Sequence, residues 1–164
     1  MLLLVRSMKD LRFGDLMAVY SQTNRSDGAA RYPEETSARQ EMMAEQDFFR
    51  YLQDCFFKTR DAVYAIWVEN GQYVSALRLE PHRNGFLLAG LETAPEHRRK
   101  GYAKKLMEAA LHEKTGRPVY SHVRKQNKPS LDVHLKCGFR IVSNAAVYAD
   151  GSAEWGAFTL CKEK

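Results

Sequence analysis

Residues 91–105 read LETAPEHRRKGYAKK, and this stretch guides the interpretation of the rest of the chain. It begins among strand-forming residues, is interrupted by Pro95 and then opens a helix with apolar positions at helical spacing. A helix start carries unpaired N–H groups and a partial positive charge, so acidic residues usually gather there. Here Arg98, Arg99, Lys100 and two further lysines gather instead, which predicts a bound anion at this helix start.

Gly101 supports the same prediction, because a residue without Cβ lets the backbone approach a phosphate closely. Ala103 adds little bulk to the first turn. The segment matches neither GxxxxGK(S/T) nor GxGxxG, so it is not one of the common nucleotide-binding loops. Charge and spacing alone equally fit a solvated basic helix end or a nucleic-acid-binding patch.

The stretch also resembles the acetyl-CoA signature of the GNAT superfamily, Q/R-x-x-G-x-G/A, which follows a strand. A second block, NKPSLDVHLKCGF at residues 127–139, is similar to the family's later N-x-x-A/S block that ends in Gly-Phe. The N-terminal third of the chain matches only in its order of elements. The resemblance implies an N-acetyltransferase that passes an acetyl group from acetyl-CoA to a primary amine, by direct attack in a ternary complex.

The resemblance also implies where acetyl-CoA binds. In the family, the amides of the signature loop hold the CoA diphosphate, and the end of the preceding strand binds the pantetheine arm. Arg98 is expected to brace the loop, and Asn127 is expected to contact the cofactor arm. The implied cofactor-binding residues are Glu92, Thr93, Ala94, Arg98, Arg99, Lys100, Gly101, Tyr102, Ala103, Lys104, Asn127, Ser130, Leu131 and His134.

The chain departs from the family pattern at the residue seven positions after Asn127, which is His134. Many family members have a tyrosine there, which acts as general acid toward the departing thiolate. A histidine with a pKa of about 6.5 can protonate a thiolate whose thiol has a pKa of about 8.5. His134 is therefore a candidate acid, and the alternative is a helix histidine that only packs or hydrogen-bonds.

Glu92 is the candidate catalytic base. Deprotonating an amine of pKa about 10.4 near pH 7 costs about 4–5 kcal/mol, which a base or a desolvating pocket should share. Glu92 lies on the strand beside the predicted thioester, although an ordinary strand glutamate would face solvent or pair with a cation. Glu80 and Glu45 are weaker candidates, the latter because it interrupts the apolar stripe of its helix.

The segments on either side of this stretch alternate between strand and helix patterns. Asn24–Tyr32 is polar and contains Gly28, which predicts a loop. The expected strands are Leu2–Arg6, Ala62–Glu69, Tyr73–Glu80, Gly85–Thr93, Pro118–Val123, Phe139–Val147 and Ala153–Cys161. Asn70–Gly71 predicts a hairpin turn, and Pro81–Gly85 predicts a second turn. The expected helices are Lys9–Thr23, Pro33–Phe57, Gly101–Lys114 and Pro129–Cys137.

The order β-α-α-β-β-β-α-β-α-β-β predicts a mixed α/β (α+β) fold in a single domain over residues 1–164. The resemblance implies a GNAT-like central sheet of about six or seven strands, mostly antiparallel and flanked by helices. The cysteines are Cys55, Cys137 and Cys161, an odd number without CxxC spacing, which argues against a disulfide framework and a zinc site. No metal is expected, and Cys137 is interpreted as structural.

A net charge of +5 weakly favours an anionic partner. No apolar run approaches the roughly 20 residues of a membrane span, so no membrane partner and a reducing cytoplasm are expected. Nucleic acid is not expected either, because aromatic residues are not interleaved with the cations. Two alternatives stay open, a CoA-binding sensor without turnover and a basic nucleic-acid-binding module. The amine acceptor is not identified, and a homodimer is possible.

Overall fold

The computed structural model describes residues 1–113 and 116–163. Its helices are α1 (Phe13–Val19), α2 (Ser21–Arg31), α3 (Ser37–Asp54), α4 (Tyr102–His112) and α5 (Lys128–Lys136). Its strands are β1 (Leu2–Val5), β2 (Val63–Glu69), β3 (Gln72–His82), β4 (Gly85–Thr93), β5 (Val119–Arg124), β6 (Arg140–Ser143), β7 (Ala146–Val147), β8 (Ala153–Glu154) and β9 (Ala157–Lys162). Short 3-10 helices cover Met8–Asp10, Phe56–Lys58 and Pro95–His97.

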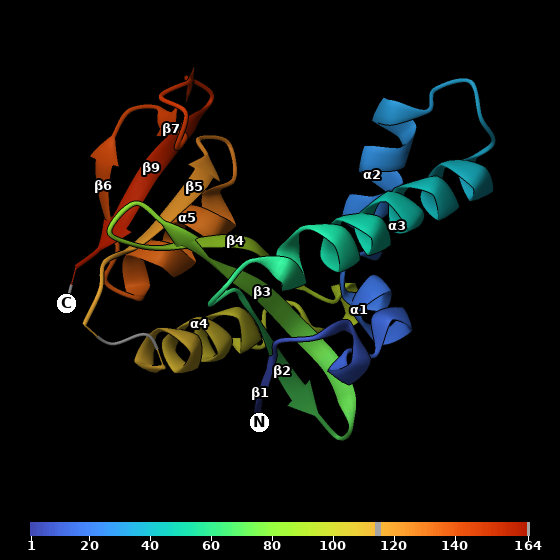
Figure 1. Cartoon of the computed structure of the whole chain (residues 1–164), viewed down its shortest axis with the longest axis horizontal. Helices are drawn as coiled ribbons and strands as arrows, with labels where there is room; N and C mark the ends of the chain where they lie inside the picture. The colour runs from blue at the N-terminus through green and yellow to red at the C-terminus, as the bar shows by residue number, and fades with distance from the viewer. Residues whose placement is uncertain (114–115, 164) are drawn as a thin grey trace.

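A sheet of seven strands in the order β1-β2-β3-β4-β5-β9-β6 forms the centre of the fold, and β7 and β8 form a separate hairpin. Neighbouring strands of the sheet run antiparallel, except that β4 and β5 run parallel. Figure 1 shows α1, α2 and α3 on the right, with α4 and α5 on the left, where the strands β5, β9 and β6 also lie. The predicted mixed fold with a mostly antiparallel sheet is confirmed.

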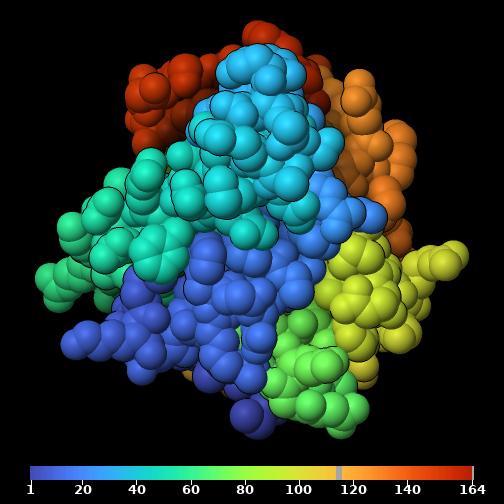
Figure 2. Space-filling model, turned by 90° about the vertical axis from the view of Figure 1, so that its right-hand side faces the viewer, coloured from blue at the N-terminus to red at the C-terminus, as the bar shows by residue number. Residues whose placement is uncertain are grey.

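The two faces of the sheet carry separate apolar clusters, because alternate residues of a strand point to opposite sides. In β2, Val63 and Ala65 join the cluster that contains α4 residues such as Leu106. Tyr64 and Ile66 join the other cluster, which includes side chains from α1, α3 and the 3-10 helix after α3. The helices α1–α3 make up the face that Figure 2 presents in blue to cyan.

The segment around the quoted stretch folds as predicted. The bounds of β4, Gly85–Thr93, agree with the prediction, and β2 and β3 form the expected hairpin around Asn70 and Gly71. Both turn residues have the positive φ angles that a tight hairpin turn uses. The first turn of α4 follows Gly101, as expected. The predicted end of this helix, Lys114, lies outside the described residues, and the described helix ends at His112.

The prediction of a loop over Asn24–Tyr32 is wrong, because this segment belongs to α2. Gly28 is a packing residue here and not a turn residue. A Cβ at Gly28 would lie 2.3 Å from the Gln40 carbonyl oxygen of α3, so glycine permits the close approach of the two helices. The single helix expected over Lys9–Thr23 is likewise divided into a 3-10 turn, α1 and the start of α2.

The helix expected to open at Pro33 begins later, at Ser37. Thr36 is its N-cap residue, and the threonine side chain accepts a hydrogen bond from the Arg39 amide at 3.4 Å. This cap provides an acceptor for one of the unpaired amides in the first turn of the helix. Two residues of the expected apolar stripe, Met42 and Phe49, are exposed.

Two further boundaries differ from the prediction. Pro81 was expected in a turn but lies within β3, paired with Phe86 of β4. The two long final strands are also divided, since β6 pairs with β9 while β7 pairs with β8. The segment from Ala145 to Val147, after β6, is held by the Thr159 hydroxyl of β9. This hydroxyl accepts a hydrogen bond from the Val147 amide at 3.1 Å and donates one to the Ala145 carbonyl at 2.8 Å.

Candidate active site

The strands β4 and β5 run side by side only over a short distance. Their described pairs are Phe86 with Val119, Leu87 with Tyr120 and Leu88 with Ser121. Beyond these pairs the two strands part, and a cavity of about 560 Å³ lies there, lined by α2, β4, β5 and the start of α5. Small-molecule sites commonly occupy about 300–1,000 Å³, so this cavity is large enough for a ligand.

A β-bulge in β4 lies at the wall of the cavity. The register with β3 shifts between Ala76 and Arg78, and Gly90 on β4 has a φ of 61°. The Tyr20 hydroxyl donates to the Gly90 carbonyl, and the Tyr64 hydroxyl donates to Tyr20 at 2.8 Å. Burial raises the pKa of Tyr20 to about 12, so its hydroxyl stays protonated as a donor. The bulge is therefore fixed by two buried tyrosines.

Arg78 lies behind this bulge. Its guanidinium stacks over Phe48 and Tyr51 of α3, with 5.5 and 5.2 Å to the ring centroids. A Cβ at Gly90 would lie 3.3 Å from its Nη2 atom, a tight contact that glycine avoids. The Glu80 carboxylate is 4.0 Å from Nε. A positive charge is thus placed next to the strand segment that lines the cavity.

The turn at residues 99–104, which leads into α4, presents main-chain amides without protein acceptors. Arg99 and Gly101 have φ angles of 62° and 80°, and the Lys105 amide donates to the Gly101 carbonyl at 3.1 Å. Within residues 1–113 and 116–163, no hydrogen bond is recorded from the amides of residues 99–104. No atom lies within 4 Å of where a Cβ at Gly101 would project. This amide turn therefore has the form of an anion site.

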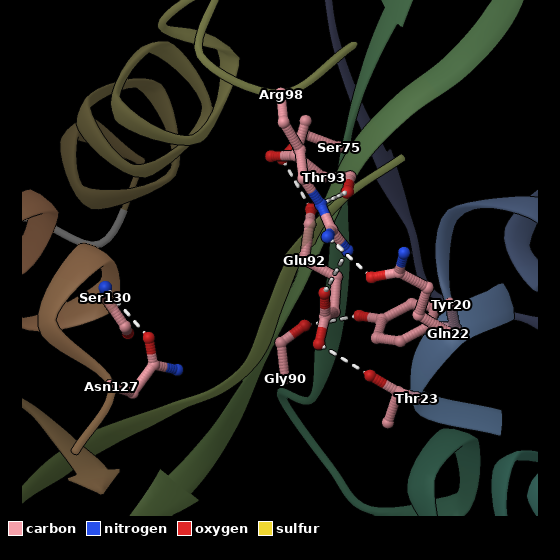
Figure 3. A network of polar contacts seen from close by, with 10 residues as sticks. All are labelled: Tyr20, Gln22, Thr23, Ser75, Gly90, Glu92, Thr93, Arg98, Asn127 and Ser130. Carbon is pink, nitrogen blue, oxygen red and sulfur yellow. Dashed lines mark hydrogen bonds and ion pairs between the residues drawn. The ribbon is translucent and has the colours of Figure 1, made fainter. Parts of the chain in front are cut away.

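The Arg98 side chain connects the amide turn to two other elements (Figure 3). Its Nε donates to the Thr93 carbonyl at 3.0 Å, and its Nη1 donates to Gln22 Oε1 of α2 at 2.6 Å. Its Nη2 lies 3.8 Å from the Glu92 carboxylate. Arg98 therefore braces the turn against α2 and the end of β4.

The Glu92 carboxylate faces the cavity from β4 and is held on both sides. The Thr23 hydroxyl of α2 donates to Oε1 at 2.8 Å, while Arg98 lies beside Oε2. The Glu92 carbonyl accepts a hydrogen bond from Ser75 at 2.7 Å (Figure 3). Its side chain remains 28% exposed, so the carboxylate is positioned and still accessible.

Asn127 and Ser130 line the cavity at the opposite wall (Figure 3). The Asn127 side-chain oxygen accepts from the Ser130 amide at 3.2 Å and so caps α5. This cap fixes the Asn127 side chain at the start of α5, where Asn127 lines the cavity.

His134 is 1% exposed and is hydrogen-bonded at both ring nitrogens. Its Nδ1 lies 2.7 Å from the Ser130 carbonyl oxygen, and its Nε2 lies 2.9 Å from Ser121 Oγ on β5. A carbonyl oxygen only accepts, so Nδ1 carries the proton and Nε2 of the neutral ring accepts from the Ser121 hydroxyl. Burial lowers the pKa of His134, only partly opposed by the bond to Ser130, which favours this neutral form.

The structure places the predicted site residues in three groups. Those that line the cavity are Glu92, Arg98, Asn127, Ser130 and His134. Those that form the amide turn are Arg99, Lys100, Gly101, Tyr102, Ala103 and Lys104. The remaining three are engaged in the protein itself. Ala94 is buried and its amide donates to the Val74 carbonyl, Leu131 packs in the core, and the Thr93 carbonyl accepts from Arg98.

Several cavity residues were not predicted from the sequence. Ser121 and His122 lie on β5, Thr23 and Gln22 lie on α2, and Gly90 forms the bulge. The alternation of polar and apolar residues in β5 is a signal for Ser121, since its neighbours Val119 and Val123 are core residues and a hydroxyl between them needs a partner. Gln22 and Thr23 had no signal of this kind, because they were placed at the end of the predicted helix Lys9–Thr23, next to a predicted loop.

The weaker candidates lie elsewhere. Glu45 is in a surface hollow with Phe13, Met42 and Phe49, and burial raises its pKa. Cys137 is buried, and burial raises the pKa of its thiol. Across the described residues, no three His, Cys, Asp or Glu side chains are grouped to hold a metal ion. Over the same residues, no helix combines the length and apolar character that crossing a bilayer requires.

The class of protein follows from the family that the chain matches, which is a family of acetyltransferases. The Acetyltransferase (GNAT) family matches residues 28–139, more than half of the chain, and the chain belongs to this family. No curated protein sequence matches the chain.

Solved structures share the fold over almost the whole chain. The PaiA N-acetyltransferase from Thermoplasma acidophilum in complex with coenzyme A is 17% identical with a TM-score of 0.65, covering 100% of this chain and 99% of that one. Aminoglycoside 6′-acetyltransferase type Ii is 15% identical at 0.60, covering 99% and 96%. An acyl-CoA N-acyltransferase from Pseudomonas aeruginosa is 16% identical at 0.59, covering 99% of each chain.

Proposed function

We propose that this protein transfers an acetyl group from acetyl-CoA to a primary amine, by direct attack in a ternary complex. The observation that carries the proposal is the set of unbonded amides at residues 99–104, which directly follow Arg98 in the wall of the cavity. A diphosphate on these amides would direct the pantetheine arm into the cavity between the two strands. The Thermoplasma PaiA protein, which has the same fold and was solved with coenzyme A, supports this choice of ligand.

The amide turn suits the diphosphate of CoA by both geometry and charge. Charge-assisted hydrogen bonds contribute about 1.5–3 kcal/mol each, so a few of them give strong binding. Gly101 leaves open space at the turn, and Arg99, Lys100 and Lys104 add positive charge around it. The cations at this helix start, unfavourable for the helix alone, then have a counter-charge.

We assign Glu92 as the base. Its carboxylate is aimed into the cavity by Thr23 and Arg98, so it is in place before the amine arrives. It takes the proton from the attacking nitrogen directly or through one water molecule. Arg78 and the Gly90 bulge lie next to the same strand segment, where a positive charge favours the oxyanion that forms at the thioester carbonyl.

The acid role of His134 depends on its protonation state. Its Nδ1 proton is donated to the Ser130 carbonyl, so only the imidazolium form has a second proton to give. Because burial lowers the pKa of His134, that form is scarce near pH 7. We propose that the thiolate, with a thiol pKa of about 8.5, leaves without His134 at neutral pH, and that His134 assists only at lower pH.

A ligand-shift assay tests the cofactor proposal. Acetyl-CoA at about 100 times its Kd should stabilise the fold by about 2.7 kcal/mol and raise the Tm by several degrees. Duplex DNA at the same charge concentration is the control and should leave the Tm unchanged. A DNA shift without a CoA shift would favour the nucleic-acid-binding alternative instead.

Turnover separates an enzyme from a sensor. A panel of primary amines is screened for release of free CoA thiol from acetyl-CoA, and at least one should accelerate release and appear as an amide by mass spectrometry. Glu92→Gln should keep the Tm shift with CoA and lose this turnover. Binding without turnover on any amine would point to a CoA sensor.

A further inference from the structure

Ser121 and His134 have an arrangement that the proposed amine transfer does not use. Ser121 is 2% exposed and lies at the last pair before β4 and β5 part, and both residues line the cavity. The hydroxyl oxygen is 2.9 Å from His134 Nε2, and the far side of the ring is fixed by the Ser130 carbonyl at 2.7 Å.

The direction of these hydrogen bonds makes Ser121 the donor and His134 the acceptor. Nδ1 donates to a carbonyl that cannot donate back, so Nε2 holds a lone pair toward the serine hydroxyl. The described neighbours of the ring include Phe139, with ring centroids 5.1 Å apart, and the recorded contacts of the ring include no carboxylate. A hydroxyl paired with a neutral base, itself oriented by a third group, is the arrangement that activates a serine nucleophile.

We propose that this pair gives the site a second activity, the hydrolysis of the acetyl thioester through an acetyl-Ser121 intermediate when no amine occupies the cavity. The inference rests on the proposed acetyl-CoA site. It adds a nucleophile and a product, acetate, that direct transfer to an amine does not require.

Ser121 Oγ attacks the thioester carbonyl carbon while its proton passes to His134 Nε2, and an O–C bond forms. The C–S bond then breaks, and the leaving sulfur takes the proton from Nε2, which yields free CoA thiol and acetyl-Ser121. A water molecule attacks the ester and gives its proton to Nε2. The Ser121 oxygen leaves, recovers that proton and releases acetic acid.

The location of the Ser121–His134 pair distinguishes a catalytic pair from a buried pair that only stabilises the fold. A structural Ser–His pair needs no access to a cavity, whereas this pair lines the cavity at the point where β4 and β5 part. The polar wall at Asn127 and Ser130 borders the same space and allows water to reach it. The proposed nucleophile lies on β5 and its base lies on α5, and both elements line the cavity.

Trapping the intermediate is the direct test. The full-length protein is mixed with acetyl-CoA without amine, quenched in acid and weighed intact, and the modified peptide is sequenced. We expect one acetyl group on Ser121 that alkaline hydroxylamine removes, because under alkaline conditions this reagent cleaves oxygen esters and leaves acetyl-lysine amides intact. Free CoA thiol is measured in parallel, so that rapid ester hydrolysis is also detected.

Variants make the result specific. Ser121→Ala and His134→Gln should lower amine-free thiol release by about 100-fold or more, as expected when a nucleophile or its base is lost. Ser37→Ala, an exposed serine of α3, is the matched control and should change nothing. Ser121→Cys should accumulate an acetyl thioester at the same position, which keeps the test valid if Ser121→Ala folds poorly.

The proposal is overturned if neither acetyl-Ser121 nor Ser121-dependent thiol release is found while CoA still raises the Tm. It is also overturned if Ser121→Ala hydrolyses acetyl-CoA as fast as the unmodified chain. If CoA produces no Tm shift at all, the proposed cofactor site fails first. The two failures are therefore distinguishable.

Discussion

The amide turn and the Glu92 carboxylate lie at opposite ends of one short connection, from the end of β4 to the start of α4, and they differ in their bonding. The amides of residues 99–104 have no acceptor within the described chain, whereas Glu92 is held by Thr23 and Arg98. An open set of donors gains its partners from a ligand, while a held carboxylate is ready before any ligand binds. The comparison indicates that binding is completed at one end and chemistry is prepared at the other.

A large effect on the affinity for CoA is expected at the open end. Gly101→Glu places a carboxylate where the diphosphate is proposed to bind, so the Kd for CoA should rise by at least about 100-fold, through charge repulsion and the loss of two or more charge-assisted bonds. Gly151→Glu is the matched control, since Gly151 also has a positive φ, 85° against 80°, and open space at Cβ. Equal calorimetric affinities for the two variants would contradict the proposed turn.

The held end is tested by Glu92→Gln. Loss of a general base lowers turnover by about 100- to 10,000-fold. The remaining rate should rise with pH, because the reaction then relies on amine that is already deprotonated in solution, and the pH–rate profile therefore shifts upward in pH. Thr23→Val removes only the hydroxyl that positions the carboxylate and should have a smaller effect. An unmoved profile in Glu92→Gln would exclude Glu92 as the base.

A smaller effect is expected where the bulge is held. Tyr20→Phe removes the donor to the Gly90 carbonyl and the acceptor of the Tyr64 hydroxyl. Two buried groups then lack partners, so the free energy of unfolding should fall by about 1–3 kcal/mol in urea titrations. Turnover should fall more than CoA affinity, because the bulge lies near the reacting carbonyl and away from the amide turn. Equal losses would mean that the two ends are not separable.

The smallest effect is in the pH dependence of stability. His134 has a lowered pKa in the folded chain, so below its unfolded value of about 6.5 the unfolded chain binds more protons. Stability from this group is therefore present above about pH 6.5 and is lost as pH falls toward the folded pKa. His134→Gln should show a flatter decline in chemical denaturation between pH 7 and 5, and an unchanged slope would contradict burial of a neutral ring.

Local patterns were sufficient to predict the amide turn, the hairpin before it and the sheet class. The turn combines Pro95, a run of cations and Gly101 within a few residues, so its signal does not depend on distant contacts. The same holds for β4, whose bounds agree with the prediction. Glu92 was selected because it lies on this well-predicted strand.

The cavity and its second wall could not be predicted in this way. Ser121 is a candidate site residue because it contacts His134 on another element and lies where β4 and β5 part. Neither feature is local in sequence. Most of α2 was missed because the polar composition of Asn24–Tyr32 and Gly28 favour a loop, and only packing against α3 makes glycine useful there. Gln22 and Thr23 fell within the predicted helix Lys9–Thr23, but their contacts with Arg98 and Glu92 depend on tertiary packing that the local sequence does not reveal.

The bond between Arg98 and Gln22 has a consequence for the order of events at the site. The Arg98 guanidinium contacts α2, the last carbonyl of β4 and the Glu92 carboxylate, and the Arg98 backbone directly precedes the turn proposed to receive the diphosphate. An acceptor that shifts α2 would lengthen the hydrogen bond between Arg98 and Gln22, and a cofactor that orders the turn would shorten it. Linkage of this kind is reciprocal, so either substrate would alter the affinity for the other by the same factor.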